Sequence, residues 1–311
     1  MSNRYFFGIE GGGSNSRLAL TDEKGKLLAA MEGRSTNIYS VTKEEVFDNL
    51  SDLLNSALES AGISKDDLAA GCIGSAGLGR DTEKVLFQEF FDIIVRPEFP
   101  VMLCGDGEIL LCGGLENLEG YCLISGTGSI ALGRSAKGDL VRAGGHGYLL
   151  GDEGSAAWIG WTAIARTLRS LENRDIATDM SGAILEATGL SHIEETIHYI
   201  HYSSDKVKVA TLAPVVTASA RKGDPLALDI IRTGAAELAL LVKSVVDRSP
   251  WINRKELVLA GGVLKNDDIL VKMLKENISR DFPSLSISSP KGSALQGACM
   301  LAINMANSNL S

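Results

Sequence analysis

Short apolar runs that end at glycine-rich turns alternate with helix-length amphipathic stretches along the chain. The run Tyr5–Ile9 is followed by three glycines, and residues 17–29 then read as a strand, a Lys-Gly hairpin and a second strand. Residues 121–141 repeat this series, with Gly11, Gly13 and Ser14 matched by Gly126, Gly128 and Ser129. Two copies far apart in the sequence indicate a duplicated domain, although two unrelated hairpins would give the same pattern.

Helix caps and apolar stripes predict the remaining elements. Thr42 and Glu45 form a capping box before an apolar stripe at helical spacing, and Gly62 ends this helix. Further strands are predicted at 68–73, 101–105, 256–260 and 285–288. Further helices are predicted at 82–93, 154–169, 177–188, 192–201, 205–221 and 225–246, from Gly262 to 280, and from Ser293 onward. Strands that alternate with helices in both halves predict an α/β fold.

The length of 311 residues exceeds the size at which one hydrophobic core usually stops growing, so we expect two domains. We place the first at residues 1–118 and the second at 119–292, with a closing helix at 293–311 that packs back on the first domain. Apolar residues make up 45% of the chain, but no run approaches the roughly 18 residues that a membrane span requires. We therefore expect no membrane partner.

The net charge bears on which partners the protein can bind, and the cysteine content bears on its cellular compartment. The net charge of −9 disfavours nucleic-acid binding, because it provides no basic surface for phosphates. The five cysteines include no C-x-x-C pair, and most lie in apolar runs, as in a cytoplasmic protein with reduced, buried thiols. The sequence leaves open whether the chain forms a homodimer.

The glycine-rich turns are the first candidates for chemistry. Backbone N–H groups in such turns can converge on a phosphate, and neighbouring hydroxyls add donors. The first turn contains Gly12, Gly13 and Ser14; the second contains Thr127, Gly128 and Ser129; a third, Gly261-Gly262, follows an apolar strand. One such turn alone also fits a structural hairpin. A Walker-type motif is absent from the sequence, so a P-loop enzyme is excluded.

Two carboxylates complete a kinase-like pattern. Phosphoryl transfer requires a held nucleotide, Mg²⁺ on its phosphates, and an acceptor hydroxyl that is oriented and relieved of its proton. Asp106 ends a strand between the two matched turns and suits the role of base. Glu10, at the mouth of the first turn, suits Mg²⁺, bound through water. The alternatives are a turn-forming Asp106 between two glycines and an ordinary strand-end Glu10.

Six motifs together resemble the BadF/BadG/BcrA/BcrD ATPase family and, within it, the N-acetylglucosamine kinases. In sequence order they are Glu10-Gly-Gly-Gly-Ser14, Ser35-Thr-Asn37, Ile124-Ser-Gly-Thr-Gly-Ser129, Gly144-Gly-His-Gly147, Gly151-Asp-Glu-Gly-Ser155 and Gly223-Asp-Pro225. The resemblance covers nearly the whole chain. It implies two ribonuclease H-like (actin-like ATPase) domains with a cleft for nucleotide and sugar between them.

The resemblance also implies roles for individual residues. Ser14 and Thr127 would contact the ATP phosphates, and Gly261, Gly262 and Asn266 would line the adenosine pocket. The sugar would be held by Asn37, Asp106, Gly145 and Asp152, with Ser75 at its border and Asp106 as base for the 6-hydroxyl. Judged from the residues alone, Asn37 also fits a turn, and Asp152 also fits the cap of the helix near Gly154.

Two positions separate branches of the family, and only the second, His146, departs from the pattern that the resemblance leads us to expect. Glu10 stands where many sugar kinases of the superfamily carry Asp, and it resembles the Glu of the animal N-acetylglucosamine kinases. His146 stands where we expect a Trp, beside the sugar site. The smaller side chain would make room for a bulkier sugar such as N-acetylmuramic acid, whose 3-lactyl ether must fit near Asp152, or it is a neutral change.

The predicted function is therefore an ATP- and Mg²⁺-dependent kinase acting on the 6-hydroxyl of an amino sugar. N-acetylglucosamine is the first candidate, followed by N-acetylmuramic acid and then glucosamine. One alternative is an ATPase activator of a 2-hydroxyacyl-CoA dehydratase, which would need cysteines for an iron–sulfur cluster shared between subunits. Another is a catalytically idle sugar or nucleotide sensor, which the presence of every expected site residue disfavours.

Overall fold

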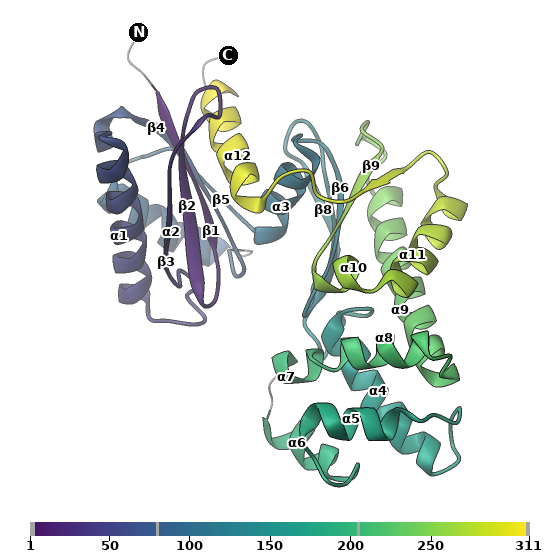
Figure 1. Cartoon of the computed structure of the whole chain (residues 1–311). Helices are drawn as coiled ribbons and strands as arrows, with labels where there is room; N and C mark the ends of the chain where they lie inside the picture. The colour runs from purple at the N-terminus through teal and green to yellow at the C-terminus, as the bar shows by residue number, and fades with distance from the viewer. Residues whose placement is uncertain (1–3, 79–80, 204–205, 309–311) are drawn as a thin grey trace. The chain divides into compact units, whose positions relative to one another are not determined.

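The computed structural model of the chain describes residues 4–78, 81–203 and 206–308, and its contacts divide it into two compact units (Figure 1). Unit 1 comprises Met1–Gly120, Ala136–Gly138 and Pro290–Ser311, and unit 2 comprises Tyr121–Ser135 and Asp139–Ser289. Each unit contains a five-stranded sheet with helices packed on it.

The sheet of unit 1 has the strand order β3-β2-β1-β4-β5. Strands β1, β4 and β5 are parallel, whereas β2 is antiparallel to both of its neighbours, β1 and β3. The strands are β1 (Tyr5–Gly11), β2 (Asn15–Asp22), β3 (Leu27–Arg34), β4 (Leu68–Ser75) and β5 (Val101–Cys104). The helices are α1 (Lys43–Ala61), the short 3-10 helix η1 (Lys65–Asp67), α2 (Asp81–Ile94), α3 (Asp106–Leu115) and α12 (Ala294–Ser308).

Helices cover both faces of this sheet (Figure 1). Phe7 and Ile9 of β1 point into a core with α1 and α2, in the period-2 alternation of a strand. The other face carries α3 and α12, where the Cys299 thiol of α12 donates to the carbonyl of Ala19 in β2. The sheet is therefore a buried layer, which leaves the strand ends and their loops as the accessible edges.

The structure confirms the predicted start and end of helix α1. The Thr42 hydroxyl accepts a hydrogen bond from the Glu45 backbone N–H, and the Glu45 carboxylate accepts one from the Thr42 N–H. At the other end, Gly62 adopts a left-handed φ of 65° and caps the helix. Hydrogen bonds to Thr42 hold the pKa of Glu45 below its usual value.

Helix α3 was not predicted from the sequence. Its three glycines depress helix propensity, but they permit close packing against α12. A Cβ at Gly113 would lie 1.9 Å from the Ser293 carbonyl oxygen, and a Cβ at Gly297 would lie 1.9 Å from the Ile109 carbonyl oxygen. Tertiary packing therefore decides the conformation here, and Asp106 becomes the first residue of a helix.

The sheet of unit 2 has the order β10-β9-β6-β7-β8, which matches unit 1 strand by strand when β6 is placed on β1. This common topology confirms the predicted duplication and the two ribonuclease H-like folds. The strands are β6 (Gly120–Ser125), β7 (Ser129–Arg134), β8 (Leu140–Gly144), β9 (Glu256–Ala260) and β10 (Ser286–Ser288). The helices are α4 (Ala156–Leu171), α5 (Met180–Thr188), α6 (Glu195–Ser203), α7 (Lys206–Ala210), α8 (Ala213–Arg221), α9 (Pro225–Asp247), α10 (Gly262–Asn266) and α11 (Asp268–Asp281).

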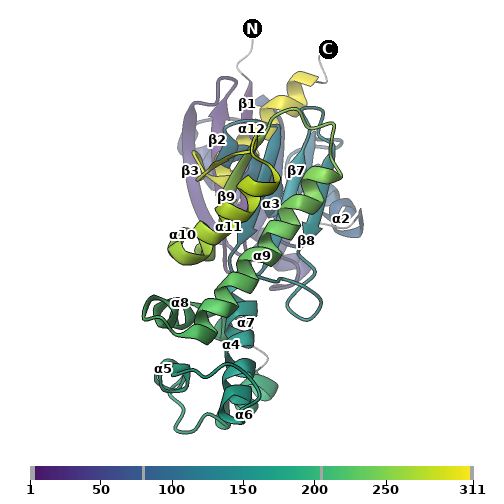
Figure 2. The ribbon, with the colours of Figure 1, turned by 90° about the vertical axis from the view of Figure 1, so that its right-hand side faces the viewer.

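Helix α9 runs across the sheet of unit 2, and α4 to α8 gather near its N-terminal end (Figure 2). Two predicted helices are divided in the structure. The helix predicted at 205–221 breaks between α7 and α8, and its first residue, Asp205, lies outside the described residues. The helix predicted from Gly262 to 280 is interrupted at Asp267, whose side chain accepts a hydrogen bond from Leu270 N and caps α11.

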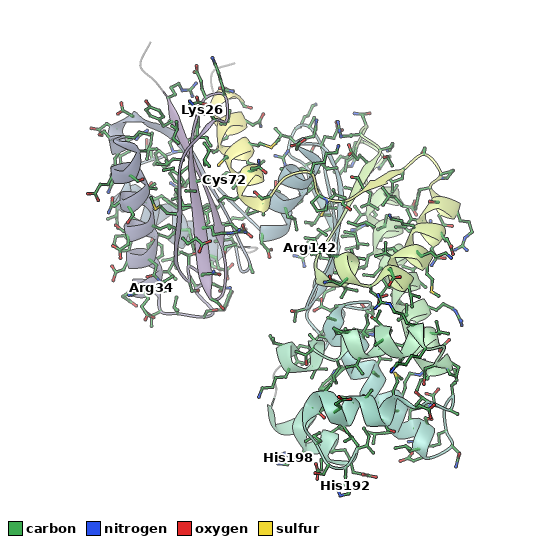
Figure 3. The ribbon with its side chains drawn as sticks, in the orientation of Figure 1. Lys26, Arg34, Cys72, Arg142, His192 and His198 are labelled. Carbon is green, nitrogen blue, oxygen red and sulfur yellow. The ribbon has the colours of Figure 1, made fainter. Side chains whose placement is uncertain are left out.

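All five cysteines are buried, as predicted. Cys72, labelled in Figure 3, is the one in strand β4 of unit 1 and has no exposed surface. Burial raises the pKa of the Cys299 thiol to about 12. Buried cysteines in apolar surroundings are chemically inert. Within the described part of the chain, no helix combines the length and apolar character needed to cross a bilayer.

Candidate active site

The predicted catalytic and metal residues of unit 1 lie along one edge of its sheet. The carboxyl ends of parallel strands meet at the same edge, and the register pairs Glu10 with Gly74 and Gly74 with Cys104. Ser75 pairs with Gly11 in the same register and is buried. Asp106 follows β5 directly, so Glu10, Ser75 and Asp106 occupy successive strand ends.

Asp106 is exposed at the N-terminus of α3. Its Oδ1 accepts a hydrogen bond from the Gly107 N–H at 3.0 Å, which fixes the side chain near the helix start. Backbone N–H groups and the helix dipole at this position favour a negative charge. The second carboxylate oxygen, Oδ2, takes no part in this hydrogen bond.

The loop that follows β3 is tied to the first glycine turn. Ser35 Oγ donates to the Gly12 carbonyl at 2.9 Å, and Thr36 Oγ1 lies 2.8 Å from Ser16 Oγ. Asn37 Oδ1 accepts from the Tyr39 N–H at 2.9 Å, so Asn37 is a turn residue in the structure. This turn engages the amide oxygen and does not involve the Nδ2 donors.

Tyr39 anchors the Asn37 loop to helix α2. Its hydroxyl donates to Glu83 Oε1 at 2.7 Å, although the side chain is otherwise 61% exposed. The ring lies against Gly77, where a Cβ would come within 2.9 Å of it. The same Cβ would lie 3.7 Å from Asn37 Oδ1, so the Tyr39 ring and the Asn37 side-chain amide both lie next to the backbone of Gly77. Sequence reasoning gave Tyr39 no role.

Glu10, the predicted metal residue, forms an ion pair with Arg17 across the β1–β2 pair, with the oxygen and nitrogen 2.5 Å apart. Its carboxylate is partly exposed at the mouth of the turn. The described residues contain no group of three or more His, Cys, Asp or Glu side chains arranged for a metal ion.

The second glycine turn, in unit 2, is held by backbone bonds. Gly126 N donates to the Gly128 carbonyl at 2.9 Å, and Ala156 N donates to the Gly126 carbonyl at 2.8 Å. Ser129 Oγ donates to the Glu153 carbonyl at 2.8 Å. The predicted phosphate turn and the loop at residues 151–155 therefore form one assembly.

Asp152 lies directly beside this turn. It is 6% exposed, and a Cβ at Gly128 would lie 2.8 Å from Asp152 Oδ2. The alternative that Asp152 caps α4 is wrong, because Ser155 Oγ accepts from Trp158 N and makes that cap. Asp152 has a left-handed φ of 63°, an uncommon conformation for a residue with a side chain. Such conformations persist where surrounding structure enforces them, often at functional sites.

Gly145 and His146 lie on the loop after β8. Gly145 N donates to the Ser129 carbonyl at 2.8 Å, which places this loop against the phosphate turn. His146 is exposed, and a Cβ at Gly151 would lie 3.5 Å from His146 Cβ. The structure thus brings together three of the predicted unit 2 residues, Gly145, His146 and Asp152, around Gly128 and Ser129.

A cavity of about 720 Å³ opens beside the same turn. Gly261, at a φ of 99°, approaches β6 so closely that a Cβ would lie 2.3 Å from the Ser125 carbonyl oxygen. Asn266 Nδ2 donates to the Gly262 carbonyl at 2.8 Å. Residues from the second and third glycine turns and from the neighbouring helices line the cavity: Gly126, Thr127, Ala156, Val207, Ala210, Thr211, Ala213, Pro214, Thr217, Arg221, Gly262, Val263, Asn266 and Asp267.

This cavity has the size and mixed character of a small-molecule site. Of the lining residues, the sequence predicted Thr127, Gly262 and Asn266 as part of a nucleotide site. It did not predict the residues of α7 and α8 that form one wall of the cavity. Pro214 and Thr217 lie in that wall within ordinary helical sequence, so no local signal marks them. Thr217 Oγ1 donates to Asp267 Oδ2 at 2.6 Å and ties this wall to α11.

The chain is similar to known proteins over nearly its whole length. The sequence model that describes the BadF/BadG/BcrA/BcrD ATPase family matches residues 7–302 of this chain. The N-acetylmuramic acid/N-acetylglucosamine kinase of Clostridium acetobutylicum is 36% identical over 301 residues, which cover 96% of this chain and 98% of the relative. The N-acetyl-D-glucosamine kinase of Dictyostelium discoideum is 27% identical over 98% of this chain and 99% of its own.

A solved structure from Chromobacterium violaceum, provisionally described as an N-acetylglucosamine kinase, has a similar fold. It superimposes with a TM-score of 0.72 at 26% identity, and the match covers 97% of this chain and 99% of that one.

Proposed function

This chain belongs to the BadF/BadG/BcrA/BcrD ATPase family, and from that premise we propose that it is an ATP-dependent kinase for the 6-hydroxyl of an N-acetylated amino sugar. The observation that carries the proposal is the pair of glycine turns at matching strand ends of two sheets with one topology, accompanied by the exposed carboxylate of Asp106. Relatives named for N-acetylmuramic acid and N-acetylglucosamine support this sugar class.

The nucleotide would be held by residues from both glycine turns. The cavity bordered by Gly262 and Asn266 would take the adenosine, and Gly261 would keep its floor close to β6. Phosphate oxygens would accept hydrogen bonds from Thr127 and from the first turn, Gly12, Gly13 and Ser14. Mg²⁺ would be held by Glu10 through water and would neutralise charge on the phosphates.

The sugar would be held by Asn37, Gly145 and Asp152, with Ser75 and His146 at its border. In the transfer, O6 of the sugar forms a bond to the γ-phosphorus, and the bond from that phosphorus to the β,γ-bridging oxygen breaks. The O6 proton passes to the Asp106 carboxylate, and ADP leaves. The protein supplies mainly position and charge, as in other phosphoryl transfers.

Sugar-dependent release of ADP from Mg-ATP tests the proposal. The panel is N-acetylglucosamine, N-acetylmuramic acid, glucosamine, glucose and N-acetylmannosamine, and we expect turnover with one or both of the first two. Glucosamine, which lacks the acetyl group, is expected to be a poor substrate. Turnover that favours glucosamine would correct the substrate class. ATP binding without turnover of any sugar would overturn the kinase proposal.

The activator alternative finds no support in the cysteines. A cluster shared between two subunits needs thiolates that are accessible at a surface. All five cysteines are buried, and Cys72 and Cys122 have no exposed surface at all. The buried cysteines thus favour the kinase over the activator.

Replacing Tyr39 with phenylalanine is expected to raise the KM for the sugar about three- to tenfold with little change in kcat, because one lost hydrogen bond to a charged group weakens the anchoring of Asn37. Steady-state kinetics with N-acetylglucosamine measure this effect. Tyr5→Phe is a control at a tyrosine on the far end of β1. An equal KM for the Tyr39→Phe variant and the parent would show that the Tyr39–Glu83 contact does not position the site.

A further inference from the structure

One arginine, Arg142, lies beside the proposed sugar loop. Arg142 lies in β8, and its Nη2 donates to the carbonyl oxygens of Gly144 at 3.2 Å and Gly145 at 3.1 Å. The guanidinium is thereby anchored to the backbone of the loop that carries Gly145 and His146. Figure 3 shows Arg142 on this part of unit 2.

The strand fixes the direction of the side chain. Val141 and Ala143, the flanking residues, pack against the core of unit 2. Arg142 therefore points to the opposite face of the sheet, away from α9, because side chains alternate along a strand. Its backbone is held on both sides, by pairing with Leu132 of β7 and by a hydrogen bond from Arg248 to its carbonyl.

The guanidinium keeps unused donors and an unpaired charge. Arginine carries five N–H donors, and only those on Nη2 are engaged here. Within the described residues, Nε and Nη1 of Arg142 make no hydrogen bond, and no carboxylate pairs with the group. A cation held by carbonyl dipoles at a fixed position is suited to binding an anion.

The charges of the chain make such a group important for an acidic sugar. The net charge of −9 disfavours the approach of an anion, so an acidic substrate needs a local cation. The other ionisable side chains on these loops include His146 and Glu153, which both lie beside Gly151, and Asp152, which lies beside Gly128. The carboxylates of Asp152 and Glu153 would repel a second carboxylate, so an acidic substrate needs the permanent positive charge of Arg142.

We propose that Arg142 determines specificity for acidic amino sugars by binding the lactyl carboxylate of N-acetylmuramic acid. The inference rests on the proposed function. N-acetylmuramic acid differs from N-acetylglucosamine by a 3-O-lactyl ether, and the carboxyl group of this lactyl substituent is ionised at neutral pH. The Nη1 donors of Arg142 would form a charge-assisted hydrogen bond to that carboxylate, while Nη2 stays on the loop. N-acetylglucosamine lacks the group and gains nothing from Arg142.

The test compares kcat/KM for the two sugars in the parent, Arg142→Gln and Arg280→Gln. Loss of a charge-assisted hydrogen bond is expected to lower the ratio of N-acetylmuramic acid to N-acetylglucosamine by about 10- to 100-fold in Arg142→Gln. Arg280→Gln removes the same charge from the exposed end of α11 and should leave the ratio unchanged. Arg142→Lys, which keeps the charge without the planar donors, should give an intermediate ratio.

The methyl ester of the lactyl group supplies a neutral probe of the same size. The parent should prefer the acid to the ester, and Arg142→Gln should lose that preference. An unchanged ratio, an equal loss for both sugars, or a parent that phosphorylates N-acetylglucosamine but not N-acetylmuramic acid would each overturn the assignment of Arg142 while leaving the kinase intact. A folded parent that phosphorylates neither sugar would overturn the proposed function and this inference together.

Discussion

Replacing Asp106 with asparagine is expected to lower kcat with an N-acetylated amino sugar by about 10²- to 10⁴-fold, the usual contribution of a general base. The amide has the shape of the carboxylate and can still accept the hydrogen bond from Gly107 N, so helix α3 should persist. It cannot take the proton of the 6-hydroxyl. Rapid-mixing kinetics and sugar binding by calorimetry would separate the loss of chemistry from any loss of binding.

Asp48→Asn is the matched control for this prediction, because Asp48 is an exposed carboxylate on α1, away from the sheet edge that carries Asp106. Its kinetics should equal those of the parent. A kcat for Asp106→Asn within a few-fold of the parent would exclude Asp106 as the base. A loss of sugar binding equal to the loss of rate would make it a binding residue only.

Replacing Gly128 with alanine is expected to lower kcat/KM by on the order of 100-fold, because a displacement of about 1 Å at a reacting centre can have that effect. The new Cβ would lie 2.8 Å from Asp152 Oδ2, which is too close, so the phosphate turn or the carboxylate must shift. One methyl group would thus disturb the proposed ATP and sugar contacts together. Separate titrations of ATP and sugar should show that both KM values rise.

Gly182→Ala is the control for the same chemical change. Gly182 lies in α5 with no atom within 4 Å of its added Cβ, so the variant should keep full activity. It should gain about 0.5–1 kcal/mol of stability from helix propensity. Thermal unfolding of both variants would show whether Gly128→Ala remains folded. Full activity in Gly128→Ala would mean that Asp152 and the turn act independently or not at all.

The structure confirms the elements that strong local sequence signals predicted. The Thr42–Glu45 capping box and Gly62 bound α1, and the repeated strand and glycine pattern indicated the duplicated sheet topology. These features depend on neighbouring residues, which a sequence displays directly. Helix α3 depends instead on contacts between Gly113 and Ser293 and between Gly297 and Ile109, which are remote in the sequence.

Among the site residues, too, some positions follow from the local sequence and others depend on contacts between remote parts of the chain. Glu10, Ser75 and Asp106 stand at strand ends, so the parallel order of β1, β4 and β5 suffices to bring them to one edge. Pro214 and Thr217 reach the cavity only because α8 packs beside the second glycine turn. Arg142 was overlooked because its anchoring carbonyls belong to a loop whose path the sequence does not specify.

The most direct test of the central claim is the position of the phosphate in the product. We predict that reaction of the protein with Mg-ATP and N-acetylglucosamine gives a product whose phosphorus couples to the C6 protons in a ¹H–³¹P correlation spectrum. The 6-deoxy sugar should give no product. Phosphate on the anomeric oxygen, or hydrolysis of ATP with the sugar unmodified, would contradict the account.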